Sequence, residues 1–140
     1  MFQNEYTRDN LAEVLRGYGI NPTHQRIEIA HAIFSRGEHL SAEQILVLVN
    51  DRASETSKAT VYNTLNLFLG KKLIREVIVD PSKVFYDPNP HPHHHFYNVD
   101  TGELTDIDAR NIRVSGLPPL PRGMATEGVD IIVRIRSSPA

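Results

Sequence analysis

The first half of the chain consists of four segments with helical hydrophobic spacing, each opened by a hydroxyl side chain. Apolar residues recur every three to four positions, as they do on one face of an α-helix. A serine or threonine before such a segment can accept a hydrogen bond from a backbone N–H of the first turn and so cap the helix. Ser41 and Gln44 also match a capping box. The candidate caps are Thr7, Thr23, Ser41 and Ser57.

We expect the four helices to bury one apolar face each. The residues predicted to face the core are Leu11, Val14, Leu15 and Tyr18, then Ile27, Ala30, Ile33 and Phe34, then Ala42, Ile45, Leu48 and Val49, and finally Val61, Leu65, Phe68 and Leu69. Glycines are predicted to end three of the helices, with Gly70 just past the fourth. Its outward face is predicted to carry Lys58, Thr60, Tyr62, Asn63 and Asn66.

Two β-rich runs, residues 73–79 and 84–87, follow the fourth helix and are separated by Asp80-Pro81-Ser82-Lys83. Such a turn between β-rich runs predicts a hairpin. Helices, a polar-faced helix and a hairpin, in this order, are typical of a winged helix-turn-helix, whereas a small helical bundle without a nucleic-acid role is the alternative. This half has no net charge, which argues against DNA binding unless the fold gathers a local basic face. The residues available for such a face are Arg26, Lys58, Lys71 and Lys72.

The composition excludes several classes of protein and site. The 140 residues contain no cysteine, so disulfides, thiolate nucleophiles and cysteine zinc sites are excluded. No apolar run is long enough for a transmembrane helix, and the start of the chain lacks the pattern of a secretion signal, which predicts a cytoplasmic protein. Motifs of zinc peptidases, serine hydrolases and phosphate-binding loops are missing.

Four of the seven histidines lie in the segment His91-Pro92-His93-His94-His95-Phe96-Tyr97, called the histidine segment below. In a strand, His91, His93 and His95 would share one face and His94 the other. Imidazoles at this spacing can bind a divalent ion, and Asp87 and Asp106 supply carboxylates nearby in the sequence. The alternatives are a solvated histidine-rich loop and an adventitious chelator.

Several motifs together resemble the ferric uptake regulator family. In chain order they are Pro22-Thr23-His24-Gln25-Arg26, His39-Leu40-Ser41-Ala42-Glu43, Ala59-Thr60-Val61-Tyr62-Asn63-Thr64-Leu65, the histidine segment and Gly102. Within the family, the chain resembles the iron response regulator branch in Tyr62-Asn63-Thr64-Leu65, in His93–Tyr97, in Asp106-Ile107-Asp108 and in residues 116–124. The resemblance implies a cytoplasmic, dimeric, non-enzymatic transcriptional regulator that binds an operator in double-stranded DNA and senses iron through haem.

The resemblance also implies a fold and a set of site residues. The fold is α+β, with a winged helix-turn-helix DNA-binding domain at residues 1–87 and a small α/β dimerisation and sensing domain at 88–140. A regulatory site for Fe, Mn or Zn would be formed by His39, Asp87, His93, His95 and Asp106. Haem would be bound by His93, His94 and His95. Candidate DNA contacts are Arg26, Lys58, Thr60, Tyr62 and Asn63.

The chain departs from many relatives in lacking the two Cys-x-x-Cys pairs of a structural zinc site. Asn98 and Thr101 stand at the first pair, so no four-cysteine zinc site forms and no thiolate can bind haem. The second half must therefore fold on apolar strands, and we expect one in which Val129, Ile131, Val133 and Ile135 form a buried face. A metal-binding protein without a DNA role, or a metal-dependent hydrolase using the same histidines, is the competing function.

Overall fold

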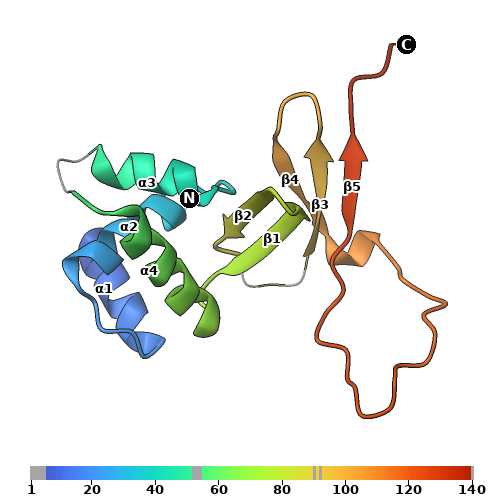
Figure 1. The fold of residues 1–140 in the computed structure, drawn as a ribbon, viewed down its shortest axis with the longest axis horizontal. Helices are drawn as coiled ribbons and strands as arrows, with labels where there is room; N and C mark the ends of the chain where they lie inside the picture. Colours follow the sequence, from blue (N-terminus) through green and yellow to red (C-terminus); the bar gives the residue numbers. More distant parts are fainter. Residues whose placement is uncertain (1–5, 52–54, 90, 92, 140) are drawn as a thin grey trace. The chain divides into compact units, whose positions relative to one another are not determined.

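A computed structural model describes residues 6–51, 55–89, 91 and 93–139. The chain divides into two compact units, Met1–Pro90 and His91–Ala140 (Figure 1), and each is described separately below. Among the described residues, none of the helices has both the length and the apolar character needed to cross a bilayer.

The first unit begins with four helices, and the predicted N-caps of all four are confirmed. The helices are α1 (Arg8–Gly17), α2 (His24–Phe34), α3 (Ala42–Asn50) and α4 (Lys58–Gly70). Each begins where the preceding hydroxyl accepts a backbone N–H three residues on. At α3 both bonds of the capping box form, since Gln44 N–H donates to Ser41 Oγ at 3.1 Å and Ser41 N–H to Gln44 Oε1 at 2.8 Å.

The core of this unit lies between the helices, and the predicted inward faces are largely confirmed. Three corrections concern Tyr18, which is 42% exposed, Thr64, which is buried on α4, and Ile29, which is fully buried outside the predicted stripe. The reason for the last is that α2 packs against α1, α3 and α4 and so needs apolar side chains on more than one side. The largest fully buried side chains are Phe68, Leu11, Leu15, Ile29, Ile33, Ile45, Leu65 and Val61.

The end of α4 differs from the prediction. Gly70 is the last residue of the helix instead of the residue after it, because Lys71 N–H still donates to Leu67 O at 3.0 Å. The left-handed conformation that often follows a helix is adopted by Lys72, with φ of 63°. The chain then turns into β1.

The predicted hairpin is confirmed as β1 (Arg75–Asp80) and β2 (Lys83–Asp87), which pair antiparallel. Its turn is held by Asp80, whose Oδ1 accepts hydrogen bonds from the N–H and O–H of Ser82, both at 2.8 Å. These bonds stabilise the carboxylate and lower the pKa of Asp80. The hairpin follows the helices in the order of a winged helix-turn-helix (Figure 1).

The second unit is a three-stranded sheet with the order β4-β3-β5. Its strands are β3 (His93–Asn98), β4 (Leu104–Asp108) and β5 (Ile132–Ile135), and a 3-10 helix, Ala109–Asn111, follows β4. Strand β3 pairs antiparallel with β4 and parallel with β5. The long segment that connects β4 to β5 has no regular secondary structure beyond the 3-10 helix.

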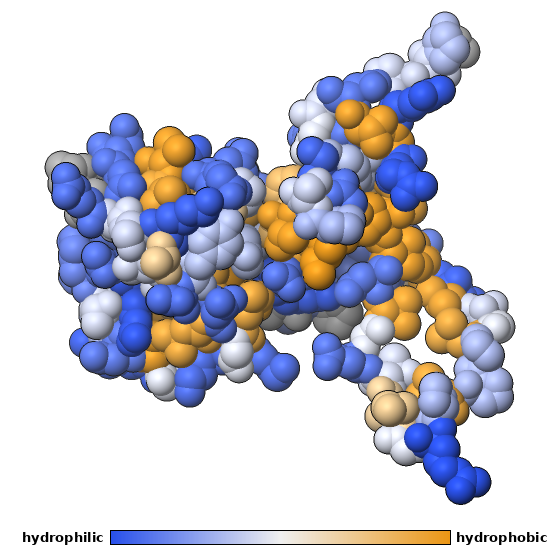
Figure 2. Space-filling view, viewed as in Figure 1, coloured by the Kyte–Doolittle hydropathy of each residue, from blue (hydrophilic) through white to orange (hydrophobic). Residues whose placement is uncertain are grey.

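The prediction that the last strand buries one apolar face is wrong for the single chain. Strand β5 begins only at Ile132, and Val129, Val133 and Ile135 are 42%, 37% and 39% exposed. The physical reason is that the described part of this unit contains one sheet and one 3-10 turn, without a second layer that would cover the sheet. Figure 2 accordingly shows hydrophobic residues at the surface of this unit.

Candidate functional site

In the first unit, a short backbone pairing brings His39 and Asp87 together. Leu40 and Tyr86 form an isolated antiparallel bridge, with Tyr86 N–H donating to Leu40 O at 2.8 Å. Their chain neighbours, His39 before α3 and Asp87 at the end of β2, are thereby placed opposite each other. As a result, His39 Nε2 lies 3.0 Å from Asp87 Oδ2.

In the second unit, His93 and His95 of β3 converge on Asp106 of β4. The two histidines lie two residues apart and so point to the same side of the strand, as the alternation predicts. His95 is the direct cross-strand partner of Asp106. The Nε2 atoms of both rings lie 3.4 Å from Asp106 Oδ1, and the ring centroids are 4.6 Å apart. Two imidazoles and a carboxylate oxygen thus face a common point.

A backbone carbonyl beside β3 selects the tautomer of His93 that can bind a metal through Nε2. His93 Nδ1 donates to the carbonyl oxygen of His91 at 2.6 Å. Because the proton sits on Nδ1, the lone pair of Nε2 remains directed toward Asp106. A hydrogen bond from the non-ligating nitrogen to a carbonyl is the usual support of a metal-binding histidine. His91 lies outside the strand and contributes this carbonyl.

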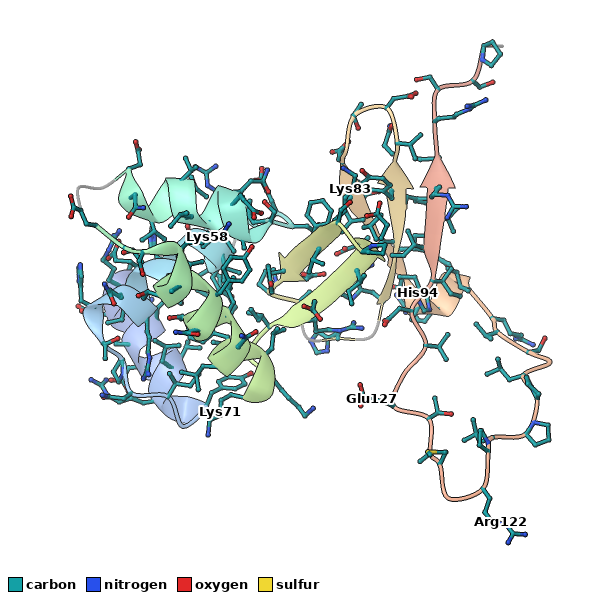
Figure 3. The ribbon with its side chains drawn as sticks, in the orientation of Figure 1. Lys58, Lys71, Lys83, His94, Arg122 and Glu127 are labelled. Carbon is teal, nitrogen blue, oxygen red and sulfur yellow. The ribbon has the colours of Figure 1, made fainter. Side chains whose placement is uncertain are left out.

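His94 lies on the opposite face of β3 and is engaged with the start of the last strand (Figure 3). The N–H of Ile131 donates to His94 Nδ1 at 3.1 Å. Since a backbone N–H is only a donor, Nδ1 must be the acceptor and the neutral ring carries its proton on Nε2. The three consecutive histidines therefore do not form one set of ligands.

A second carboxylate of β4, Asp108, is held away from the histidines by an arginine. Asp108 is the cross-strand partner of His93. Its carboxylate accepts hydrogen bonds from Arg110 Nε at 3.1 Å and from Arg110 Nη2 at 2.8 Å. This contact lowers the pKa of Asp108 to about 2. Asp106 is therefore the β4 acid that faces the two imidazoles.

The substitution Arg110→Met is expected to raise the pKa of Asp108 from about 2 toward its ordinary value, because the guanidinium donors are removed. The pKa is lower in the folded chain, so the pair favours folding fully above about pH 4 and the effect is lost as the pH falls toward 2. NMR titration of the side-chain carboxyl carbon measures this shift. Arg113→Met is the matched control, and a shift of similar size in it would contradict the assignment.

The residues predicted to contact DNA differ in whether their side chains are hydrogen-bonded within the protein or exposed. Tyr62 Oη donates to Glu43 Oε2 on α3 at 3.0 Å, which raises the pKa of Tyr62 because the phenol donates to a carboxylate. Lys58 Nζ lies 5.9 Å from the centre of the Tyr62 ring. Asn63 is exposed. The contact of Glu43 with Tyr62 was not predicted from the sequence, because no local pattern connects residues that lie nineteen positions apart.

Two further predicted DNA contacts are bonded locally. Thr60 Oγ1 accepts a hydrogen bond from Ser57 Oγ at 3.0 Å, within the first turn of α4. Arg26 lies on α2, and its Nη1 donates to the carbonyl oxygen of Asn21 at 3.0 Å. Four of the five predicted DNA contacts therefore lie on α4, and Arg26 belongs to another helix of the same unit.

Comparisons with known proteins identify the family to which this chain belongs. Residues 18–127 match the model of the Ferric uptake regulator family. The Peroxide-responsive repressor PerR of Staphylococcus epidermidis is 29% identical over 93 residues, which cover 66% of this chain and 62% of that protein. The match thus spans less than two thirds of the relative's length.

Two solved structures show the same fold. The ferric uptake regulator of Vibrio cholerae has a TM-score of 0.69 at 18% identity, covering 90% of this chain and 98% of that one. The ferric uptake regulator of Pseudomonas aeruginosa, solved with manganese, has a TM-score of 0.66 at 23% identity, covering 98% of both chains. The predicted fold class is confirmed. Since the family match spans most of the chain, the protein belongs to the ferric uptake regulator family.

Proposed function

We propose that the protein is a metal-responsive, DNA-binding transcriptional regulator whose operator binding is controlled by one divalent ion. The observation that carries this proposal is the convergence of His93 Nε2 and His95 Nε2 on Asp106 Oδ1. The His39–Asp87 pair of the first unit supplies two further donors of the same types. Three imidazoles and two carboxylates suit Fe(II), Mn(II) or Zn(II). The related regulator of Pseudomonas aeruginosa was solved with manganese.

The proposed site is the set His39, Asp87, His93, His95 and Asp106, which draws ligands from both parts of the chain. We assign DNA binding to residues 1–87 and dimerisation and sensing to residues 88–140. An ion bonded to ligands of both parts would restrain their relative orientation. A ligand shifts such an equilibrium only by its different affinity for the two states, and about 1.4 kcal/mol is sufficient for a tenfold response.

A second copy of the chain is the proposed partner of the sensing domain. The apolar side chains that remain exposed on β5 would be buried if the sheets of two copies met across a two-fold axis. In such a dimer the two α4 helices would enter successive major grooves roughly 34 Å apart, or a multiple of that distance. The operator is therefore expected to be palindromic.

Haem is a more specific candidate than a divalent ion for the signal that the protein senses. The resemblance to the iron response regulator branch suggests it. The face of β3 that carries His93 and His95 fits this role, because neutral imidazole is a suitable axial ligand for haem iron. His94 does not fit, since its Nδ1 accepts from Ile131 and its Nε2 carries the proton. Haem and the divalent ion would therefore compete for the same two histidines.

The test is selection of bound duplexes from a random pool with the full-length, Mn(II)-loaded protein, followed by affinity measurements on the selected sequence. We expect a palindromic sequence whose affinity changes at least about tenfold when the metal is chelated, and changes again when haem is added to the loaded protein. Absence of any selected sequence would refute DNA regulation. A parallel screen of the loaded protein for hydrolase activity tests the competing function, which requires an open coordination position.

A further inference from the structure

The second unit exposes most of its large apolar side chains. Among its described residues, the buried apolar side chains are only Tyr97, Leu104 and Ile107, whereas nine large apolar side chains are exposed. Small domains with so little core usually depend on a disulfide, a structural metal or oligomerisation. The chain has no cysteine, which excludes a disulfide and a cysteine-bound zinc. The exposed apolar side chains lie mainly in two places, one on the sheet and one on a loop.

The first set of exposed apolar side chains lies on one face of the sheet. Phe96 of β3 is the direct partner of Val133 of β5, and Ile135 lies two residues further along β5 on the same side. All three side chains are exposed, and we call them the apolar sheet face. His93 and His95 point to the other side of β3. The apolar sheet face can therefore be covered without blocking the two imidazoles.

The second set lies on the loop between β4 and β5 (Figure 1), in which residues 113–130 are all exposed. Part of this loop, Leu117–Met124, is called the proline segment below. It carries the most exposed large apolar side chains of the unit, at 62%, 51% and 66%, which are Leu117, Leu120 and Met124. Figure 3 shows Arg122 of this segment at the far end of the loop. The proline segment therefore does not cover the sheet of its own chain.

The conformation of the proline segment is largely fixed before it contacts anything. Proline holds its own φ at about −65° and restricts the residue before it to extended backbone. Three prolines therefore keep residues 117–121 extended. A turn follows, in which Met124 N–H donates to Pro121 O at 3.1 Å and Gly123 has φ of 81°. A preorganised segment loses little conformational entropy when it packs against a surface.

The chemistry of the proline segment favours packing on the face of a sheet over pairing with its edge. Prolines lack the N–H that a strand needs to donate to its neighbour. An extended proline-rich chain has three residues per turn, so Leu117 and Leu120 lie on one edge, about 9 Å apart. This leucine edge matches an apolar surface such as that formed by Phe96 and Val133.

We propose that the proline segment of one copy packs on the apolar sheet face of a second copy, and the reverse, so that each sheet receives its second layer from the partner. The proposal rests on the dimer of the proposed function and specifies what lies between the two sheets. Contacts across a two-fold axis are reciprocal, so a single interface covers both exposed sets. An unrelated protein would have to supply a groove for the segment and also a cover for the sheet.

The first experiment is cross-linking between two copies of the full-length chain, in which introduced cysteines are the only thiols. Leu120→Cys and affinity-tagged Val133→Cys proteins are mixed in urea, refolded together and treated with a short bismaleimide. We expect a covalent dimer that joins position 120 of one copy to position 133 of the other, identified by mass spectrometry. In the matched control, Val47→Cys replaces Val133→Cys, because Val47 is equally accessible but lies on α3 of the first unit. The control should give little of this product.

The second experiment measures the dissociation constant of the dimer by sedimentation. The double variant Leu117→Asp, Leu120→Asp should raise this constant at least about a hundredfold, because each lost leucine contact corresponds to a factor of about ten or more. Both side chains are exposed in the single chain, so its fold should remain intact, with an unchanged circular dichroism spectrum. The control is Val47→Asp, Ile78→Asp, which places the same charges at two exposed apolar positions of the first unit.

The outcomes separate this inference from the proposed function. A dimer without the 120–133 cross-link, or with an affinity that the leucine substitutions leave unchanged, overturns the exchange of segments. Cross-linking within one chain in a Leu120→Cys, Val133→Cys double variant, instead of between chains, shows that the segment closes on its own sheet and also overturns it. A monomeric wild type does the same. DNA regulation fails independently, if the wild type shows the cross-link but selects no sequence from the random pool.

Discussion

Replacing His95 with alanine is expected to lower the affinity of the protein for Mn(II), Fe(II) or Zn(II) by more than about a hundredfold, because loss even of a residue that supports a metal ligand costs 10–100-fold. His95 Nε2 converges with His93 Nε2 on Asp106 Oδ1, so the substitution removes one of three donors in this unit. Isothermal titration of the metal-free protein measures the effect.

His94→Ala is the matched control for this prediction, since it removes an adjacent imidazole from the other face of the same strand. Its metal affinity should stay within a few-fold of the wild type, because His94 Nδ1 is bonded to Ile131 and not directed at Asp106. Equal losses in the two variants would contradict the assignment of the metal to one face of β3. The same pair of variants, titrated with haem and followed by absorption, tests whether haem uses that face too.

Replacing Phe68 with alanine is expected to destabilise the first unit by about 3–5 kcal/mol, because a fully buried aromatic ring is lost and a cavity remains. Phe68 lies on α4 and belongs to the hydrophobic core that joins this helix to α1, α2 and α3. Such a loss approaches the whole stability of a small domain. Urea unfolding followed by circular dichroism at a helical wavelength reports on this unit, since every described α-helix belongs to it.

Val47→Ala on α3 is the control, because this side chain is 68% exposed and its truncation should change the stability by less than about 0.5 kcal/mol. The Phe68 variant should also lose operator binding at temperatures at which the wild type still binds, since an unfolded first unit cannot present α4. A loss below about 1 kcal/mol in the Phe68 variant would mean that the ring is not enclosed as described.

The starts of the helices and the position of His93 and His95 on one face of a strand could be predicted from the sequence, because both depend on neighbours in the chain. A hydroxyl accepts an N–H three residues on, and strand alternation places residues two apart on the same side. The hairpin was predictable for the same reason, since Asp80 and Ser82 form its turn locally. The family motifs supplied His39 and Asp87, which the Leu40–Tyr86 bridge brings within hydrogen-bonding distance.

Other features depend on contacts between distant parts of the chain, and no local pattern encodes them. The parallel pairing of β3 with β5 engages His94 with Ile131, thirty-seven residues away, and removes it from the set of ligands suggested by the run of three histidines. The packing of α3 beside α4 couples Glu43 to Tyr62, nineteen residues apart, and so occupies the hydroxyl of a residue that the sequence pattern places on the outward face of the helix. Composition and spacing therefore specify which chemical groups the chain carries. Long-range packing decides which of these groups form hydrogen bonds within the protein and which are left to face a ligand. The physical reason is that an internal hydrogen bond occupies a donor or acceptor that a ligand would need.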